Sequence, residues 1–497
     1  MIKYGYLWLM PCIGNMKTRQ HTCNNQFRCT RVYRPLQTPY HNHCIICYAT
    51  LYDLVVVGGG PAGCFAAVQL CETSYPNVPK ILILERASRI LEKVRISGGG
   101  RCNVTNEESD PRVFAQHYPR GEKELIGPLT RFGSVEMKQW LKDRGVAWKT
   151  ERDGRVFPVS DTSQTIIQCI QQQLLRYNVQ VRLLCCVTGI ERDNDGHFRI
   201  HIGGGKHQAS ISSRYVLVST GSNRLAYRWI ASLGHVKDSS SSFLCPSLFT
   251  FCIDDIRIQG LSGITVQDVC LKISSVSFRN HVQRGPLLIT HWGLSGPAVL
   301  KLSAWGARTL AENNYKAQLS IDWLPSIHIE EIRSILTDTK HTWKTKQVTT
   351  TCPFRDKNGR QFLAKELWRN IVVHTLKTED NAAMKKMWKD ISKAQIAALS
   401  TALKSSIFEI RGKGIFKEEF VTCGGIGRKH VHFETMESKW IPGLYFAGEI
   451  LDIDGLTGGF NLQAAWTTGY ICGRSIAKRL EMLHRANDDI DGKDGQG

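Results

Sequence analysis

Short runs of apolar residues alternate along the chain with stretches in which apolar residues recur at helical spacing. Four mostly apolar runs lie at Leu54–Val57, Lys80–Leu84, Tyr215–Ser219 and Leu444–Ala447, and each is too short to cross a membrane. A strand buried on both faces of a parallel sheet has such an uninterrupted run. Within Thr162–Tyr177 the apolar residues recur every three or four positions, as on the buried face of a helix. The pattern predicts an α/β fold with a parallel sheet.

The middle of the chain has a different pattern. Short strand-like segments punctuated by turn residues fill Phe243–Leu324, which predicts a β-rich region. The residues that follow have helical spacing and an excess of basic side chains. We therefore expect an inserted β-rich, barrel-like domain at 239–325, a helical basic subdomain at 326–404 and a return strand of the inserted domain at 405–420.

The first apolar run leads directly into Gly58-x-Gly60-x-x-Gly63, after which a helix is expected to begin. In a strand–turn–helix unit the first glycine permits the tight turn, the second lets the backbone approach a pyrophosphate, and the third lets helix and strand pack closely. The pyrophosphate lies at the helix N-terminus, where free N–H groups favour an anion. The second run ends at Glu85, 22 residues after Gly63, where an acceptor for ribose hydroxyls is needed. This order of features predicts a dinucleotide site.

A second glycine-rich block lies near the end of the chain, within Gly443–Gly473. A short strand ends at Gly448-Glu449, and Gly458-Gly459 precedes a helix that begins near Asn461. A flavin benefits from a second helix N-terminus, because its N1–C2=O edge becomes negative on reduction. The block therefore favours FAD over NAD as the tightly bound cofactor.

The charge of the chain is +20, but it is unevenly distributed. The first 52 residues carry six Lys or Arg and no acid, and residues 325–404 carry 15 basic against 8 acidic residues. In the second segment the charges follow helical spacing, as on a solvated face, without an evident aromatic–basic surface for stacking bases. We therefore expect a small-molecule substrate and do not expect nucleic acid as a partner.

The N-terminal segment 1–50 resembles a transit peptide in being basic and free of acids. We expect a plastid or mitochondrial destination, and otherwise the cytoplasm; the alternative is a mispredicted upstream extension. The chain has 17 cysteines, which are scattered as in a protein of a reducing compartment. One Cys44-x-x-Cys47 pair is too little for a zinc site, so no metal is expected. The polar tail 485–497 is expected to be disordered.

Five segments together carry a family resemblance: VVGGGPAG at 56–63, ISGGGRCNVTN at 96–106, THWGLSGPAVL at 290–300, VTCGGI at 421–426 and the block at 443–473. The chain resembles the BaiN/RdsA-type NAD(P)/FAD-dependent oxidoreductases, also called YhiN-like flavoproteins, some of which are labelled aminoacetone oxidases. The resemblance implies a glutathione-reductase-like FAD-binding Rossmann domain that is split in sequence, at 51–238 and 421–484, around the insertion.

The resemblance also implies which residues hold the cofactor. The pyrophosphate side would use the loop of Gly58 to Gly63 with Thr220 and Gly221, the adenosine side Glu85 and Val187, and the flavin side two further segments. The implied residues are Gly58, Gly60, Pro61, Ala62, Gly63, Glu85, Arg86, Arg101, Cys102, Asn103, Val187, Thr220, Gly221, Gly448, Glu449, Asp454, Gly458, Gly459, Phe460, Asn461 and Leu462.

The expected function is hydride transfer through flavin N5 to or from a small organic substrate. The chain has no second Gly-x-Gly-x-x-Gly motif, so NAD(P)H as electron donor would have to dock transiently. His291 is the candidate for proton delivery, although a structural histidine is the alternative. The competing hypotheses are an amine oxidase that uses oxygen, a flavin-dependent RNA-modifying protein, and a protein in which FAD is only structural.

Overall fold

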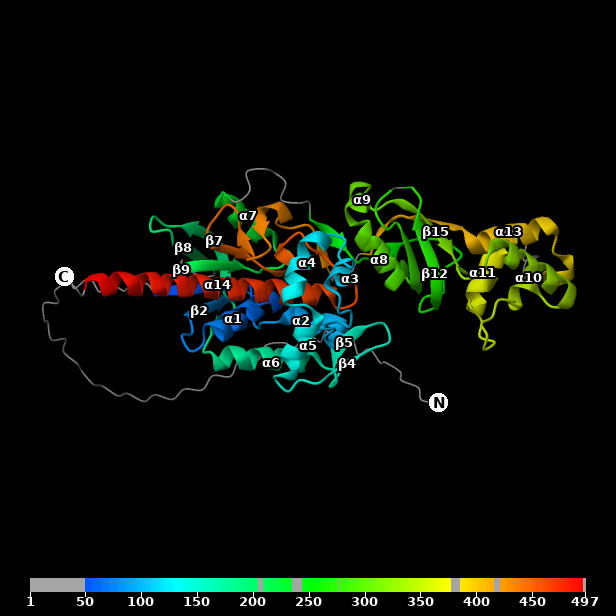
Figure 1. Cartoon of the computed structure of the whole chain (residues 1–497). Coiled ribbons are helices and arrows are strands. Elements are labelled where there is room, and N and C mark those ends of the chain that lie inside the picture. Colours follow the sequence, from blue (N-terminus) through cyan, green and yellow to red (C-terminus); the bar gives the residue numbers. More distant parts are fainter. Residues whose placement is uncertain are drawn as a thin grey trace, which may run out of the picture. The chain divides into compact units, whose positions relative to one another are not determined.

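The computed structural model describes residues 50–203, 209–234, 244–275, 277–376, 385–414 and 421–494 (Figure 1). The predicted leader and its Cys44-x-x-Cys47 pair lie outside the described residues. Among the residues that are described, no helix is long and apolar enough to span a membrane.

A parallel sheet forms the core of the first domain. Its strands lie in the order β21 (Leu444–Phe446), β9 (Ala209–Val218), β1 (Leu51–Val57), β2 (Ile81–Leu84) and β6 (Gln180–Arg182), and all adjacent pairs are parallel. Leu54, Val55 and Val56 are fully buried, as expected for a strand covered on both faces. Each of the four apolar runs in the sequence lies in one of these strands. The predicted parallel α/β sheet is therefore confirmed.

Antiparallel strands extend this sheet. An antiparallel meander is formed by β7 (Cys186–Arg192), β8 (Phe198–Gly203) and β9, which the meander shares with the parallel sheet. At the β21 end of the sheet, β20 (Glu437–Ser438) pairs with β21 and β19 (Val431–His432) pairs with β20. Strand β21 comes from the last fifth of the sequence but pairs with β9, so the Rossmann domain is assembled from two separate parts of the chain.

Two helices from these separate parts pack directly together, α1 (Pro61–Ser74) and α14 (Phe460–Asp494), as Figure 1 shows in blue and red. Glycines of α14 permit the close approach. A Cβ atom on Gly469 would lie 2.6 Å from the Ala62 carbonyl oxygen, and one on Gly473 would lie 2.4 Å from the Ala66 carbonyl oxygen. The contact fixes the N-terminus of α1 relative to the N-terminus of α14.

Smaller elements complete this domain. They are α2 (Glu92–Ile96), α3 (Pro111–Ala115), α4 (Glu122–Arg131), α5 (Ser134–Lys142), α6 (Ser163–Arg176) and α7 (Arg224–Ser232), and a three-stranded sheet of β3 (Thr105–Asn106), β5 (Arg155–Pro158) and β4 (Trp148–Thr150). Helix α14 extends to Asp494, which differs from the disordered tail predicted from residue 485.

The insertion has its own sheet and its own apolar core. Seven strands lie in the order β16 (Ser406–Ile410), β15 (Ala317–Asp322), β12 (Thr265–Ile273), β13 (Val282–Thr290), β14 (Gly293–Ser295), β11 (Phe251–Cys252) and β17 (Gly412–Lys413). Helices α8 (Pro297–Trp305) and α9 (Ala307–Glu312) belong to its β-rich part, and α10 (Ile329–Thr342), α11 (Lys365–Leu376) and α13 (Lys393–Lys404) to its helical part (Figure 1). Strands β16 and β17 lie where the return strand was expected.

The insertion leaves and re-enters the Rossmann domain at one place. Strand β10 (Cys245–Ser247) precedes the inserted sheet, β18 (Val421–Cys423) follows it, and the two pair antiparallel. We call this pair of strands the junction.

Candidate functional site

The three glycines of the predicted phosphate loop have the three different environments that a dinucleotide loop requires. Gly58 has φ +109°, and a Cβ atom there would lie 2.5 Å from the Ser219 carbonyl oxygen. A Cβ atom on Gly63 would lie 2.4 Å from both the Gly58 carbonyl oxygen and the Ser219 hydroxyl. A Cβ atom on Gly60 would meet nothing closer than 4.0 Å. Gly58 and Gly63 are therefore required by packing, whereas Gly60 leaves open space for a ligand.

Helix α1 begins at Pro61, immediately after Gly60, and no side chain caps its N-terminus. The uncapped first turn offers backbone N–H groups to an anion. The Thr220 hydroxyl, in the loop after β9, is buried and has no hydrogen-bond partner among the described residues. A buried hydroxyl is normally satisfied, so a ligand that binds here can supply the missing partner.

Glu85 lies at the carboxyl end of β2, beside the phosphate loop. Its side chain accepts hydrogen bonds from the N–H of Gly59 at 2.8 Å and of Ala87 at 2.7 Å. Each carboxylate oxygen has a second lone pair, so Glu85 can still accept from ribose hydroxyls. The neighbouring Arg86 is exposed, and Val187 is buried at the start of β7. The predicted roles of Arg86 and Val187 stay predictions.

The second glycine-rich block lies against the phosphate loop. A Cβ atom on Gly448 would lie 2.9 Å from the Cβ atom of Ala62, the second residue of α1. The Glu449 carboxylate accepts a hydrogen bond from the Thr422 N–H at 2.9 Å, and a Cβ atom on Gly221 would lie 3.5 Å from that carboxylate. Residues near positions 60, 220 and 448 thus form one site.

The loop at 96–106 packs against the start of α14. A Cβ atom on Gly459 would lie 2.3 Å from the Thr105 carbonyl oxygen, so only glycine fits there. With its amide oriented to satisfy both neighbours, Asn103 accepts from the Gly459 N–H at 2.8 Å and donates to the Thr105 carbonyl at 3.0 Å. Asn106 donates to the Gly458 carbonyl at 3.1 Å.

The first residues of α14 make different contacts. The Phe460 side chain is buried and stacks on His117 with ring centroids 4.2 Å apart. The Asn461 side chain holds the preceding loop by accepting from the Gly455 N–H and donating to the Gly455 carbonyl, both at 2.8 Å. The half-buried Leu462 lies in the first turn. These contacts position the N-terminus of α14 beside the loop that carries Asn103.

Arg101 and Cys102 lie in the loop at 96–106, and their predicted contact with the cofactor stays a prediction. The Arg101 guanidinium pairs with Glu151 at 2.7 Å and lies over the Phe157 ring at 4.0 Å. The Cys102 backbone has φ +64°, and burial raises the pKa of its thiol to about 12. A thiol with this pKa stays protonated near neutral pH, which agrees with a contact role rather than thiol redox chemistry.

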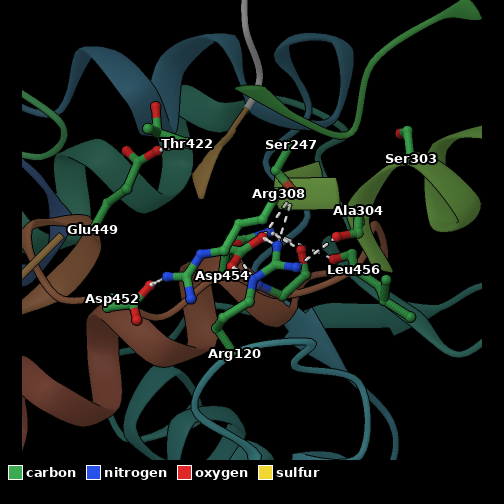
Figure 2. A network of polar contacts seen from close by, with 12 residues as sticks. Arg120, Ser247, Ser303, Ala304, Arg308, Thr422, Glu449, Asp452, Asp454 and Leu456 are labelled. Carbon is green, nitrogen blue, oxygen red and sulfur yellow. Dashed lines mark hydrogen bonds and ion pairs between the residues drawn. The ribbon is translucent and has the colours of Figure 1, made fainter. Parts of the chain in front are cut away.

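Asp454 lies in the predicted segment, but its carboxylate is taken by other side chains (Figure 2). Arg120 donates to it through Nε at 2.5 Å and through a second guanidinium nitrogen, and the Ser247 hydroxyl donates at 2.7 Å. Burial disfavours the charge on Arg120, but the Asp454 carboxylate outweighs this and raises the pKa of the guanidinium. Asp454 therefore joins the Rossmann domain to the junction through its side chain, and its predicted place beside the flavin stays a prediction.

A neighbouring ion pair and a second contact of Arg120 extend this network (Figure 2). Arg308 of α9 pairs with Asp452 at 2.7 Å, and Arg120 also donates to the Ala304 carbonyl of α8 at 2.6 Å. Local sequence gives no sign of these contacts, because the partners are more than a hundred residues apart. Thr422, which holds Glu449, was also missed, although it lies within the VTCGGI motif.

His291 lies in the inserted domain, in the turn between β13 and β14. It is exposed, and its role in proton delivery and the structural alternative both stay predictions. Together with Trp292, whose side chain is half exposed, it borders a pocket of about 520 Å³. Asp254, Gln259 and Arg411 also line this pocket, and Asp254 pairs with Arg411 at 2.7 Å.

The residues present fit a flavin dinucleotide. The open space at Gly60, the uncapped α1 and the unpartnered Thr220 hydroxyl fit a pyrophosphate, and Glu85 fits a ribose. The start of α14, which packs against α1, supplies the second helix N-terminus that a flavin ring uses.

Comparisons with known proteins agree with this assignment. A family model described as "HI0933-like protein Rossmann domain" matches residues 52–475. A 3-dehydro-bile acid delta(4,6)-reductase of Clostridium scindens is 26% identical over 433 residues, which cover 85% of this chain and 98% of that protein. A ribosomal RNA dihydrouridine synthase of Haemophilus influenzae is 27% identical over 439 residues, covering 86% and 98%. A protein of the same name from Escherichia coli is 24% identical, also covering 86% and 98%.

Proposed function

Because the chain belongs to the HI0933-like family and is an FAD-dependent oxidoreductase, we propose that it reduces a carbon–carbon double bond conjugated to a carbonyl group. The relatives' names support this choice of bond. A delta(4,6)-reductase of a 3-dehydro-bile acid and a dihydrouridine synthase both saturate such a bond in a ring. The proposed electron donor is NAD(P)H, docking transiently.

One observation carries the flavin-dependent part of the proposal. Two glycine-rich segments that are distant in sequence meet, with Gly448 against Ala62. A nicotinamide dinucleotide needs only the first segment, whereas a flavin dinucleotide uses both. Bound FAD would supply the hydride acceptor and donor. The chain's own residues would hold it, with the α1 N-terminus and Thr220 at the pyrophosphate, Glu85 at the ribose, and Asn103 and Gly459 positioning the flavin side.

We further propose that the pocket beside His291 receives the substrate. Its volume of about 520 Å³ is in the range typical of small-molecule sites. The exposed Trp292 offers a flat face to a ring, and Gln259 offers both a donor and an acceptor to a carbonyl or amide edge. Saturating the double bond requires a proton as well as a hydride, and we assign delivery of this proton to the imidazole of His291, which lines the pocket.

The test is an anaerobic visible spectrum of the purified full-length protein. Flavin absorption should bleach with NADPH and return when 2-cyclohexenone is added, but not with the saturated control cyclohexanone. In His291→Gln, bleaching should keep its rate while the return slows by about 10²- to 10⁴-fold, the usual contribution of a general acid. If only oxygen restores the absorption, and an amine rather than NADPH bleaches it, the amine-oxidase hypothesis is favoured instead.

A second candidate substrate is uridine in ribosomal RNA, favoured by the names of two relatives and by the excess of 15 basic over 8 acidic residues at 325–404. The same reduced protein would then be reoxidised by ribosomal RNA that lacks dihydrouridine. Binding should weaken steeply between 50 and 200 mM salt, because phosphate contacts release counterions. Salt-insensitive binding, or RNA that returns without dihydrouridine, contradicts this candidate.

A further inference from the structure

Two cysteines face each other across the junction. Cys245 in β10 and Cys423 in β18 are directly opposite in the antiparallel register. Directly opposed residues of an antiparallel pair have Cα atoms about 4.5 or 5.5 Å apart, depending on their hydrogen bonding. Disulfides span Cα separations of about 4.4–6.8 Å, so the spacing expected for this pair lies within the range that a disulfide bridges.

The two thiols are already in contact and are enclosed. Cys245 is 2% exposed and Cys423 is fully buried, in a small cluster with Ala307 of α9. Each thiol is hydrogen-bonded to the other. Both are free thiols, because the structure contains no bond between them.

The surroundings of Cys423 favour its thiolate. The hydrogen bond from Cys245 lowers the pKa of Cys423 against the effect of burial, and the nearby guanidinium groups of Arg120 and Arg308 lower it further, while Asp454 opposes them. In contrast, burial raises the pKa of the isolated thiols of Cys102 and Cys352 to about 12. A thiolate is the nucleophile in thiol oxidation, so Cys423 is the attacking member of the pair.

We propose that Cys245 and Cys423 are a redox-active dithiol that a hydroperoxide oxidises to a cross-strand disulfide. The Cys423 thiolate attacks the peroxide and becomes a sulfenic acid, and hydroxide leaves and takes up a proton to become water. The sulfur of Cys245 then attacks the Cys423 sulfur, the S–O bond breaks, and the departing oxygen leaves as a second water. Two thiols and one hydrogen peroxide thus give one disulfide and two waters.

The disulfide would fasten the two ends of the insertion to each other. The same strands reach the cofactor site and the ion-pair network, because the Thr422 N–H donates to Glu449 and the Ser247 hydroxyl donates to Asp454. Oxidation would therefore change the junction, which contacts the cofactor site and the ion-pair network, and would not require the substrate pocket. This inference goes beyond the proposed function and does not depend on it.

The test uses the folded full-length protein, treated with one equivalent of hydrogen peroxide, quenched with acid, alkylated in denaturant and mapped without reduction. The expected product is one cross-linked pair of peptides carrying Cys245 and Cys423, lighter by two hydrogen atoms than the sum of the two and restored by dithiothreitol. The thermal unfolding midpoint of the oxidised protein should rise, because a long loop is closed in the unfolded chain.

Variants separate this pair from other cysteines. Cys245→Ser and Cys423→Ser should each abolish the cross-link, whereas the control Cys270→Ser should keep it, since Cys270 is half-buried and faces Arg284 and Asp322 instead of a cysteine. The peptide map of the wild-type protein tests the proposal even if a variant fails to fold. The proposal is overturned if both cysteines of the folded, peroxide-treated protein remain alkylatable, or if they cross-link only after unfolding.

Discussion

Among the three glycines of the phosphate loop, Gly60 is the one whose missing Cβ atom would point into open space. Its φ is −79°, which an L-residue adopts without strain. We therefore expect Gly60→Ala to fold with a free energy of unfolding within about 0.5 kcal/mol of wild type, as for substitutions that disturb no packing. Its affinity for FAD should fall at least tenfold, which is about 1.4 kcal/mol, because the methyl group occupies the approach to the pyrophosphate.

Chemical denaturation and fluorescence titration with FAD would measure the two effects separately. Gly127→Ala in α4 is the matched control, because a Cβ atom there also meets nothing within 4 Å but lies in a helix away from the loop. Equal FAD affinity in wild type and Gly60→Ala would contradict the proposed cofactor position.

The buried pair of Arg120 and Asp454 predicts a large stability effect from a small chemical change. Asp454→Asn leaves the Arg120 guanidinium enclosed without an opposite charge, and losing one partner of a buried ion pair costs about 3–5 kcal/mol. Urea unfolding should show this loss. The matched change Asp254→Asn breaks an exposed pair with Arg411 and should cost less than about 1 kcal/mol. Similar losses of unfolding free energy in the two variants would show that the buried pair does not stabilise the junction.

At the scale of elements, α1 and α14 touch along their backbones at Gly469 and Gly473. Gly473→Ala would place a methyl group 2.4 Å from the Ala66 carbonyl oxygen. We expect it to destabilise the protein by about 1–3 kcal/mol, the usual cost of overpacking a core. Alanine normally stabilises a helix interior relative to glycine, so Gly127→Ala in α4 should move stability in the opposite direction. A Gly473→Ala variant as stable as wild type would mean that the two helices can separate at little cost.

Elements were predictable where the signal is local. The apolar run of β1 and the motif from Gly58 to Gly63 together gave strand, turn and helix, since burial and backbone geometry act over a few residues. The same holds for the start of α14, which is preceded by Gly458 and Gly459. The end of α14 was not predictable in this way, because its polar tail carries no apolar stripe and yet continues the helix to Asp494.

Contacts between distant elements could not be predicted from the pattern. The family motif that contains Asp454 does not indicate its partner Arg120, which lies 334 residues earlier in the chain. Likewise, nothing near Glu449 indicates that the Thr422 N–H will bind it. Polar residues identify a site only when the fold shows which of their hydrogen bonds are already satisfied.

For the whole molecule, FAD binding should increase the free energy of unfolding, because residues from both parts of the split Rossmann domain form the site. FAD present at 100 times its dissociation constant should add about 2.7 kcal/mol to the free energy of unfolding. The thermal midpoint should rise with FAD concentration and rise less with riboflavin, which lacks the pyrophosphate and adenosine. A midpoint that is independent of added FAD in cofactor-free protein would contradict the assignment.

The pairing of β10 with β18 also bears on how such a protein can diversify. The insertion leaves and re-enters the Rossmann domain through the paired strands β10 and β18. The two ends of the insertion therefore stay adjacent whatever sequence lies between them. Doubling the length of a flexible connection costs only about 0.6 kcal/mol of closure entropy. Descendants of one ancestor could thus lengthen, shorten or exchange the inserted domain while keeping the cofactor machinery, and acquire new specificities by substituting one module.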